Sequence, residues 1–483
     1  MLTLTHKSWR ALAAPLALGI VFAAGAGLVA CGGNNSMSGP GGSTTTASAP
    51  LVTNVGDAPM TSALSAQVTV AAVDALTSSG QSVAILPAPR TIELGPLGGV
   101  REPLELNSLT AGTYTGVSVT VTAAKLVYVD PSTNQVVFDT NVALGGGGSS
   151  VSASYTFNNP VTVSQNQGVD LRLDFNLGQS FDLSGSTVTF TPVITAAMGD
   201  IDKGTPDDLD VRAAGIVTAI SSTSVTLTMF DSGASITFAI NNETDFDDNT
   251  TAASISTGAV VYVRGSVQSD GTYLAKEIDP ADAGSKFGTQ FNAAGAGRVI
   301  AVTDNSSGQL SSFQLVTYTN FAAGEIGREV TVNVSSTTNY WFSNWAGKAG
   351  VTAFDATQIF PGQTVAYAGN SSDGGVTVSA LSVRLGQQTL YGTLASTVSS
   401  DTEPITFTLQ LKPMTLFPLL TGAADVTVTG GTDMRFGDSF ESGISEVTNS
   451  DAIGIHGFVE QDVSGGVVSG YTEYSTRLGM EDN

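Results

Sequence analysis

The chain has 483 residues, of which 41% are hydrophobic and only 12% charged, and its 42 acidic residues outnumber 18 basic ones to give a formal net charge of −24. This length predicts several domains, since one domain takes about 150 residues. The charge excludes a nucleic-acid partner, because such binding depends on neutralising phosphates. The only cysteine is Cys31, which excludes an intrachain disulfide.

The first thirty residues have the form of an export signal. Lys7 and Arg10 precede an almost wholly apolar stretch from Ala11 to Val29. A basic segment followed by an apolar one is typical of a signal peptide. The alternative is a plain signal or a membrane-spanning anchor in which the cysteine is incidental.

The end of this stretch predicts a lipid anchor. Leu28, Val29 and Ala30 lead directly into Cys31, and this sequence resembles the bacterial lipobox. The resemblance implies attachment of a diacylglycerol to the Cys31 thiol, cleavage before Cys31 and acylation of the new amine, with palmitate among the chains. Two or three chains anchor a protein stably. Gly32 after the cysteine favours the outer membrane of a Gram-negative bacterium.

Composition divides the rest of the chain into a tether and folded units. Gly, Ser and Thr dominate after the cysteine and indicate a flexible tether. The expected segments are a signal peptide (1–30), a tether (31–50), a β-sandwich (51–198), an acidic linker (199–211) and three barrel repeats (212–280, 295–386 and 389–478).

The sandwich unit shows clear strand alternation. Val117, Val119 and Val121 alternate with Ser and Thr, which places one face in a core and the other in water. Only the segment from Ala63 to Leu76 could form a helix instead of a strand. We therefore expect an antiparallel sandwich.

This unit resembles the bacterial domain-of-unknown-function family 4382. The resemblance covers nearly the whole unit and implies a domain without an assigned activity. Its motifs are Gly56-Asp57-Ala58-Pro59, Ile92-Glu93-Leu94, the segment 109–115, the segment 170–175 and the segment 190–194.

The remaining chain repeats loosely, with a glycine-led strand opening each unit and a second glycine late in each unit. Each unit offers five or six short strands, and closure into a small OB-like or SH3-like barrel would remove the exposed edges. The units resemble the domain-of-unknown-function family 5666, most clearly the first. The openings are Gly215-Ile216-Val217, Gly297-Arg298-Val299 and Gly392-Thr393-Leu394, and the later segments are Val263-Arg264-Gly265, Ala368-Gly369 and Ile455-His456-Gly457.

No residue pattern predicts an enzyme. His456 is the only histidine after the signal, and it sits in a strand pattern without a recognisable triad. We interpret it as an ordinary strand residue. No metal or cofactor motif is present. Because the chain has 42 acidic residues, some pair of carboxylates always looks catalytic, so such a pair is no evidence for an enzyme.

Calcium is the remaining hypothesis for the acidic residues. Oxygen ligands for a hard cation are offered by the linker, and by Asp245, Asp247 and Asp248. Solvated acidic loops are the alternative. The linker acids are Asp200, Asp202, Asp207, Asp208 and Asp210.

The most distinctive local feature is aromatic. Tyr340, Trp341 and Trp345 fall in the long central insertion of the second repeat, and no other tryptophan follows the signal. Exposed rings would suit stacking on a glycan. The alternative is that they plug the barrel or a domain junction.

The sequence therefore predicts an all-β, lipid-anchored cell-envelope protein of a non-enzymatic, structural or interaction type. Its expected partners are the membrane, through the anchor, and a glycan or an envelope protein. Two alternatives stay open: a glycan-binding surface lipoprotein and a calcium-stabilised adhesin.

Overall fold

A computed structural model describes residues 48–480, except for 59, 98–100, 140, 186, 202–209, 247–249, 281–290, 321–325, 397, 399–403, 437–442 and 465–466. The described chain is almost entirely strand, so the all-β prediction is confirmed. None of the helices in this part of the chain has the length and apolarity needed to cross a membrane.

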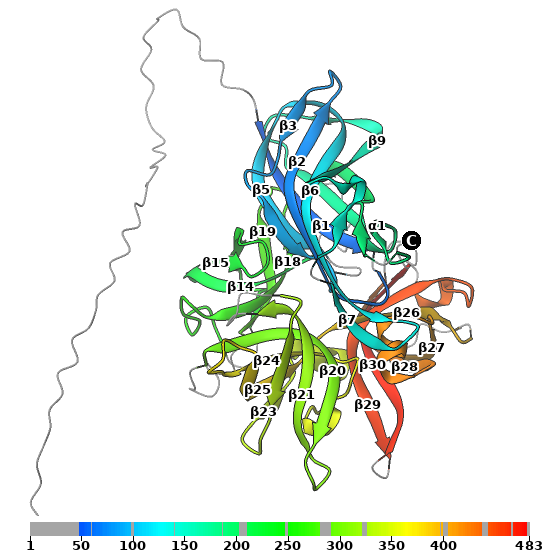
Figure 1. Cartoon of the computed structure of the whole chain (residues 1–483). Helices are drawn as coiled ribbons and strands as arrows, with labels where there is room; N and C mark the ends of the chain where they lie inside the picture. The colour runs from blue at the N-terminus through cyan, green and yellow to red at the C-terminus, as the bar shows by residue number, and fades with distance from the viewer. Residues whose placement is uncertain are drawn as a thin grey trace, which may run out of the picture. The chain divides into compact units, whose positions relative to one another are not determined.

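Two sheets pack face to face in the first unit (Figure 1). One sheet has the order β13-β10-β1-β5, and its strands are β1 (Ser48–Ala58), β5 (Glu102–Thr110), β10 (Val169–Asn176) and β13 (Ile194–Asp200). The other has the order β3-β2-β6-β7, with β4 paired to β2 and β9 to β6. Its strands are β2 (Ala63–Thr77), β3 (Ser82–Ala84), β4 (Arg90–Glu93), β6 (Gly112–Asp130), β7 (Gln135–Asp139) and β9 (Val151–Val163). A small third sheet joins β8 (Ala143–Leu144), β11 (Phe181–Asp182) and β12 (Thr189–Phe190).

The sandwich departs from the expected antiparallel arrangement in its first sheet. β1 pairs antiparallel with β5 but parallel with β10, from Leu51 opposite Val169 to Ala58 opposite Asn176. A parallel neighbour needs a long crossover rather than a hairpin, and the whole second sheet lies between β1 and β10 in the sequence. Local alternation carries no information about such a distant partner.

The segment that could have been a helix is the strand β2. Val68, Val70 and Val73 are buried in the sandwich core, and the strand pairs with β6 over nearly its full length. β-branched residues favour a pleated surface, and this long pairing overrides any helical tendency. The alternating valines of β6 are buried as predicted.

Three barrels follow, and they share one strand order. The first is β16-β15-β14-β18-β19, closed by β16 with β19, and the second is β22-β21-β20-β24-β25, closed by β22 with β25. The third closes as β26-β27-β28-β30-β29. In each, the third and fifth strands pair in parallel. This order is that of the OB-fold rather than an SH3-like barrel.

The strands of the barrels have the following bounds. In the first barrel they are β14 (Asp210–Ile220), β15 (Ser224–Met229), β16 (Ser235–Ala239), β17 (Asp245–Phe246), β18 (Val260–Val267) and β19 (Tyr273–Pro280). In the second they are β20 (Ala293–Asp304), β21 (Leu310–Asn320), β22 (Glu329–Asn333), β23 (Asn339–Trp341), β24 (Thr364–Asn370) and β25 (Thr377–Leu385). In the third they are β26 (Gln388–Leu394), β27 (Ile405–Leu411), β28 (Asp425–Phe436), β29 (Ile453–Ser464) and β30 (Val467–Met480).

The repeated glycines have a structural reason. In the three opening strands, a Cβ at Gly215, Gly297 or Gly392 would collide with a carbonyl oxygen of the neighbouring strand. The later glycines follow a register shift in the fourth strand of each barrel, between Arg264 and Gly265 in the first and between His456 and its following glycine in the third. Such bulges bend a strand sharply, so each unit needs both glycines to close.

Helices are few and short in the part of the chain that the structure describes. They are α1 (Leu177–Ser180), α3 (Asn344–Ala349) and α4 (Leu416–Thr421), with 3₁₀ turns η1 (Gly145–Gly147), η4 (Ala356–Gln358) and η6 (Ile444–Glu446). Ser343 caps α3 by accepting the Ala346 N–H, and Gly350 ends it in the left-handed conformation. This helix lies between the third and fourth barrel strands of the second repeat.

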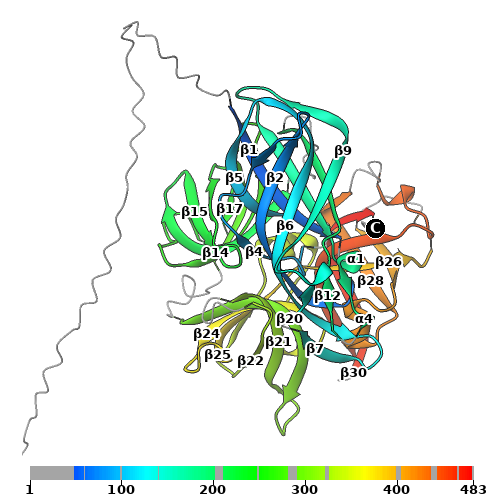
Figure 2. The ribbon, with the colours of Figure 1, turned by 45° about the horizontal axis from the view of Figure 1, so that its top comes forward.

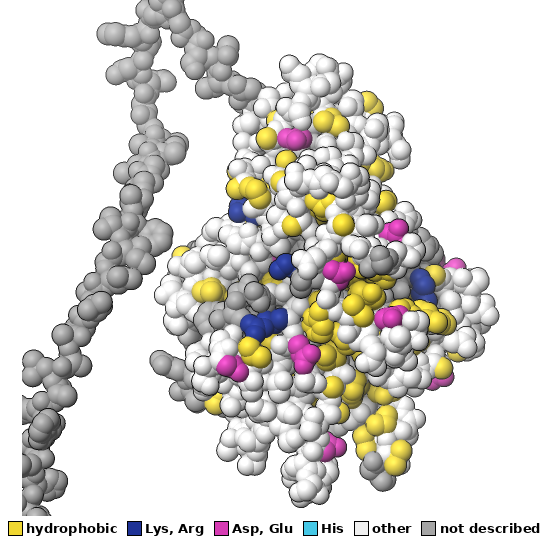
Figure 3. All heavy atoms as spheres, in the orientation of Figure 1, with side chains coloured by type: hydrophobic (Ala, Val, Ile, Leu, Met, Phe, Trp, Pro, Cys, Tyr) yellow, Lys and Arg dark blue, Asp and Glu magenta, His cyan; other side chains and the backbone are white. Residues whose placement is uncertain are grey.

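An apolar cluster joins the sandwich to the second and third barrels. Buried Leu64 and Val127 from the sandwich meet Val316 of β21, and leucines of α4 pack against them. Both ribbon views place β7 beside β20 and β21 (Figures 1 and 2). In Figure 3 hydrophobic side chains gather in the middle of the face shown, and charged side chains are scattered over the rest.

Candidate functional site

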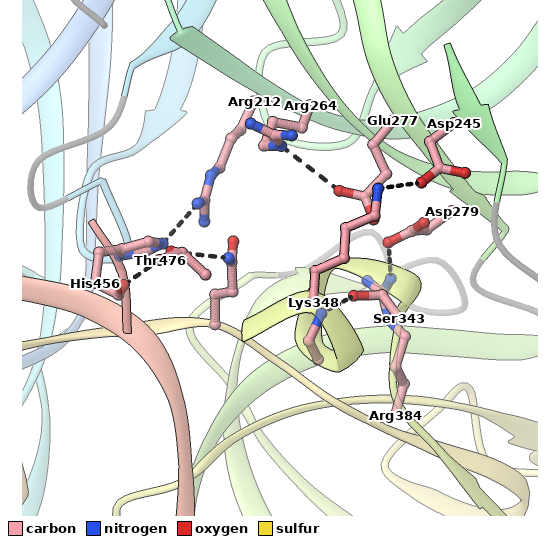
Figure 4. A network of polar contacts seen from close by, with 12 residues as sticks. Arg212, Asp245, Arg264, Glu277, Asp279, Ser343, Lys348, Arg384, His456 and Thr476 are labelled. Carbon is pink, nitrogen blue, oxygen red and sulfur yellow. Dashed lines mark hydrogen bonds and ion pairs between the residues drawn. The ribbon is translucent and has the colours of Figure 1, made fainter. Parts of the chain in front are cut away.

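A cavity of about 180 Å³ lies where the three barrels meet, close to the loop after β4. We call it the junction cavity. Its charged and aromatic lining is Glu102, Arg212, Tyr262, Arg264, Glu277, Asp279, Tyr318, Trp345, Arg384 and Phe458. Figure 4 shows several of these side chains turned toward one another from different barrels.

The first contact across the junction centres on Arg264 of β18. Its guanidinium lies 3.9 Å from the centre of the Trp345 ring, which belongs to α3 of the second barrel. Glu277 of β19 pairs with the same guanidinium at 3.5 Å. The bulge before Gly265 sets the local backbone here. A cation held over an aromatic face by a partly buried carboxylate adds about 1 kcal/mol or more.

The second contact runs in the opposite direction. Arg384 of β25 donates to Asp279 of β19 at 2.5 Å. Its guanidinium carbon lies 4.5 Å from the Tyr262 ring centre and 5.4 Å from that of Trp341. Each of the first two barrels therefore places an arginine on an aromatic ring of the other. We call these two contacts the arginine clasps.

His456 connects the third barrel to the first. Arg212 of β14 lies 2.6 Å from His456 Nε2, and Thr389 Oγ1 lies 2.7 Å from Nδ1. Burial, then the charges of Arg212 and other nearby arginines, lowers the pKa of His456 well below its usual value. The imidazole is therefore neutral, accepts from Arg212 and donates to Thr389. Thr476 also donates to the His456 carbonyl at 2.8 Å.

This geometry changes the interpretation of His456. The residue is in a strand, as predicted, but it also bridges two barrels. It occupies the same position before the bulge glycine as Arg264 does in the first barrel. Equivalent positions of two repeats therefore face the junction. Repeat alignment within the sequence would have indicated this equivalence.

The three aromatic residues singled out from the sequence are not an exposed platform. Trp341 is 8% exposed, and Tyr340 is half-buried with its ring 6.1 Å from Phe354. Trp345 lines the junction cavity, and Arg264 covers one of its faces. The structure thus places these rings in the second barrel and at its junction with the first.

Of the acidic residues considered for calcium, the structure describes the side chains of Asp200 and Asp245 alone. Among the described residues no group of three or more His, Cys, Asp or Glu side chains could hold a metal ion. Asp245 instead pairs with Lys348 at 2.9 Å, and Asp200 accepts from Gln167. Asp202, Asp207, Asp208, Asp247 and Asp248 lie outside the described residues, as does the Asp210 side chain.

The anchor residues Leu28, Val29, Ala30 and Cys31 also lie outside the described residues.

A buried acidic group forms a second polar centre beside the first barrel. Glu93 accepts from the Ser65 hydroxyl at 2.5 Å and from the Ala66 and Gly95 amides. Its own amide donates to Asp231 of the first barrel at 3.0 Å. Burial, opposed by these hydrogen bonds, raises the pKa of Glu93 to about 7. Burial and Asp231 also raise the pKa of Glu102. Both carboxyls therefore hold a proton more tightly than an exposed glutamate does.

Two family models match the chain. Residues 48–192 match the family described as Domain of unknown function (DUF4382), and residues 214–279 match Domain of unknown function (DUF5666). The families and their order are those expected from the sequence. No curated protein matches the chain.

Solved structures similar to parts of the chain are small β proteins. A copper(II) complex of a CusF variant from Escherichia coli is 20% identical, with a TM-score of 0.13, and the match covers 15% of this chain and 94% of that one. Silver-bound CusF is 22% identical, with a TM-score of 0.12, and the match covers 14% of this chain and 93% of that one. Drosophila Unr CSD456 is 8% identical, with a TM-score of 0.14, and the match covers 52% of this chain and 91% of that one.

Proposed function

We propose that this chain, a DUF4382 domain followed by a DUF5666 domain and two further barrels, is a lipid-anchored envelope protein of a non-enzymatic type. Its barrels form a rigid interaction scaffold. The observation that supports this best is the pair of arginine clasps together with the Arg212–His456 contact. In these contacts the charged side chains at the junction bind a neighbouring barrel.

The anchor part of the proposal is carried by the sequence around Cys31. The thiol receives a diacylglycerol after export, and a tether up to residue 50 holds the folded units away from the bilayer. Gly32 favours the outer membrane. The expected acyl chains include palmitate, and the strongly acidic composition keeps the protein away from nucleic acid.

The test is the membrane attachment of full-length protein. Metabolic labelling with a palmitate analogue should mark the wild type and not Cys31→Ser, and the variant should appear in the soluble fraction. Mass spectrometry should find a mature chain that begins at an acylated Cys31. A mature terminus elsewhere, or an unmodified thiol in membrane-extracted protein, overturns the proposal.

The scaffold part has a separate test. If the clasps join the barrels, Arg264→Ala should increase protease cleavage between the first and second barrels without unfolding the sandwich. Lys348→Ala, which removes only a surface ion pair between the same barrels, is the matched control. Equal cleavage of the two variants would contradict the scaffold.

A second candidate function is recognition of a glycan. The observation that favours it is that Trp345 lines a cavity that has charged side chains in its wall and is large enough for part of a sugar ring. Polysaccharide should then quench the fluorescence of Trp341 and Trp345, and Trp345→Ala should abolish the response. No quenching across a broad glycan panel would end this candidate.

A further inference from the structure

A second, smaller cavity adjoins the junction cavity, and we call it the side chamber. It has a volume of about 60 Å³ and lies among the sandwich, the second barrel and the third barrel. Pro96, Tyr318 and Gln387 line both cavities. The other polar side chains of the side chamber are Thr61, Arg298, Thr364, Gln388, Thr389, Tyr391 and Thr415.

Arg298 brings an uncompensated charge into the side chamber. Its only hydrogen bond within the described chain is from Nη1 to the Gly362 carbonyl at 3.0 Å, and no described carboxylate lies within ion-pair distance. Arg264 and Arg384, by contrast, have Glu277 and Asp279. Arg298 is partly buried, and withdrawing a guanidinium even partly from water without a counter-ion carries a desolvation cost.

The electrostatic surroundings agree with this. Burial lowers the pKa of Arg298, and the groups that oppose the shift are the hydroxyls of Tyr318 and Tyr391 rather than a carboxylate. The side chamber is therefore electropositive inside a chain whose net charge is −24.

Gln388 adds a donor that has no acceptor in the described chain. The residue is 3% exposed, and its Oε1 accepts the Thr364 amide at 2.8 Å. This bond fixes the orientation of the side-chain amide, and Nε2 has no hydrogen-bond partner. Thr364 lies directly opposite Arg298 in the β20–β24 ladder. The Arg298 guanidinium, which has no counter-ion among the described residues, and the unpaired Gln388 Nε2 thus belong to one connected group of residues.

We propose that the side chamber binds the carboxylate of a small monoanionic ligand, with Arg298 and Gln388 Nε2 as its donors. A planar guanidinium and an amide N–H match the two oxygens of a carboxylate. One uncompensated arginine accounts for one negative charge. This site lies beyond the scaffold role and does not depend on it.

The size of the cavities limits the ligand. About 60 Å³ holds a few water-sized groups, which suits a carboxylate with a short substituent. The shared walls at Tyr318 and Gln387 place the junction cavity next to it, so a hydroxyl-bearing body extends in that direction. The ligand class is a hydroxy acid or a sugar acid.

Binding is tested on purified full-length protein by calorimetry and thermal unfolding. The probes are acetate, lactate and glucuronate, each against acetamide, lactamide or glucose, at constant ionic strength in chloride. At least one acid should give a saturable heat and a rise in Tm that its neutral counterpart does not give. No response to any acid, or an equal response to chloride or to the neutral compounds, overturns the proposal.

Two variants locate the site. Arg298→Met should weaken the acid response at least tenfold, because it removes a charged hydrogen bond. Gln388→Glu keeps the oxygen that accepts the Thr364 amide and supplies a carboxylate from the protein itself, so it should also abolish the response. Lys125→Gln, an exposed residue of β6, is the control for loss of a positive charge and should bind as the wild type does.

Stability of the ligand-free protein separates a binding role from a structural one. If Arg298 serves to bind a ligand, it does not stabilise the ligand-free fold. Arg298→Met and Gln388→Glu should then have a Tm equal to or above that of the wild type. If Arg298 instead stabilises the fold through a role other than binding, both variants should melt earlier. That result, or a wild-type acid response in both variants, contradicts the assignment.

Discussion

Glu93 makes the stability of the sandwich depend on pH. The carboxyl is 2% exposed, and burial raises its pKa from 4.5 to about 7. In the unfolded chain the pKa returns to its ordinary value. The folded state therefore binds a proton more tightly than the unfolded state, and the free energy of unfolding is highest below pH 4.5. It falls as the pH rises through about 7.

The magnitude follows from the two pKa values. A change from 4.5 to about 7 disfavours the folded state by about 3 kcal/mol once Glu93 is ionised, since one pKa unit corresponds to about 1.4 kcal/mol. Between pH 5.5 and pH 8.5 the loss is about 2 kcal/mol. Burial also raises the pKa of Glu102, Glu460 and Glu473, so the wild type should lose further stability over the same range.

Glu93→Gln isolates the contribution of this residue. The amide oxygen still accepts from the Ala66 and Gly95 backbone, and the Ser65 hydroxyl can turn to accept from the new NH₂ group. Urea unfolding, followed by circular dichroism, should show the variant gaining about 2 kcal/mol on the wild type between pH 5.5 and pH 8.5.

The control is Glu243→Gln in an exposed turn, which should follow the wild type at both pH values. If the difference between Glu93→Gln and the wild type is the same at pH 5.5 and pH 8.5, Glu93 does not titrate in this range and the reasoning fails.

Three further predictions concern the barrels and the anchor. A double-mutant cycle of Arg264→Ala and Trp345→Ala, measured by urea unfolding, should give a coupling of about 1 kcal/mol, and additive effects would show that the clasp contributes nothing. Gly297→Ala should lower the free energy of unfolding by about 1–3 kcal/mol because its Cβ meets the Val316 carbonyl, whereas Gly199→Ala, which meets no atom within 4 Å, should change it by less than about 0.5 kcal/mol. Cys31→Ser should release the protein from membranes in cell fractionation, and a membrane-bound variant would exclude the lipid as its attachment.

Much of the fold followed from local sequence patterns. Alternation of valine with serine and threonine predicts strands such as β6, because the period of two is a property of the strand itself. The glycines of the barrels are visible in the sequence, and the strand order explains them. The parallel pairing of β1 with β10 was missed, since it joins segments more than a hundred residues apart.

The site was harder to predict. Arg212, Arg264, Arg384 and His456 come from three repeats, and none of them forms a local motif. Their contacts depend on how the barrels pack, which no spacing in the sequence encodes. The sequence did offer one indication. The chain has only 18 basic residues, so an arginine within a barrel strand is unusual and indicates a specific partner.

The three barrels share one strand order, but their side chains at the junction differ. Arg264, His456 and their partners differ between equivalent positions, so each copy recognises a particular neighbour. Deleting, shuffling or adding a unit would leave charged side chains facing the wrong surface. The contacts at the junction therefore depend on the order in which these three units follow one another.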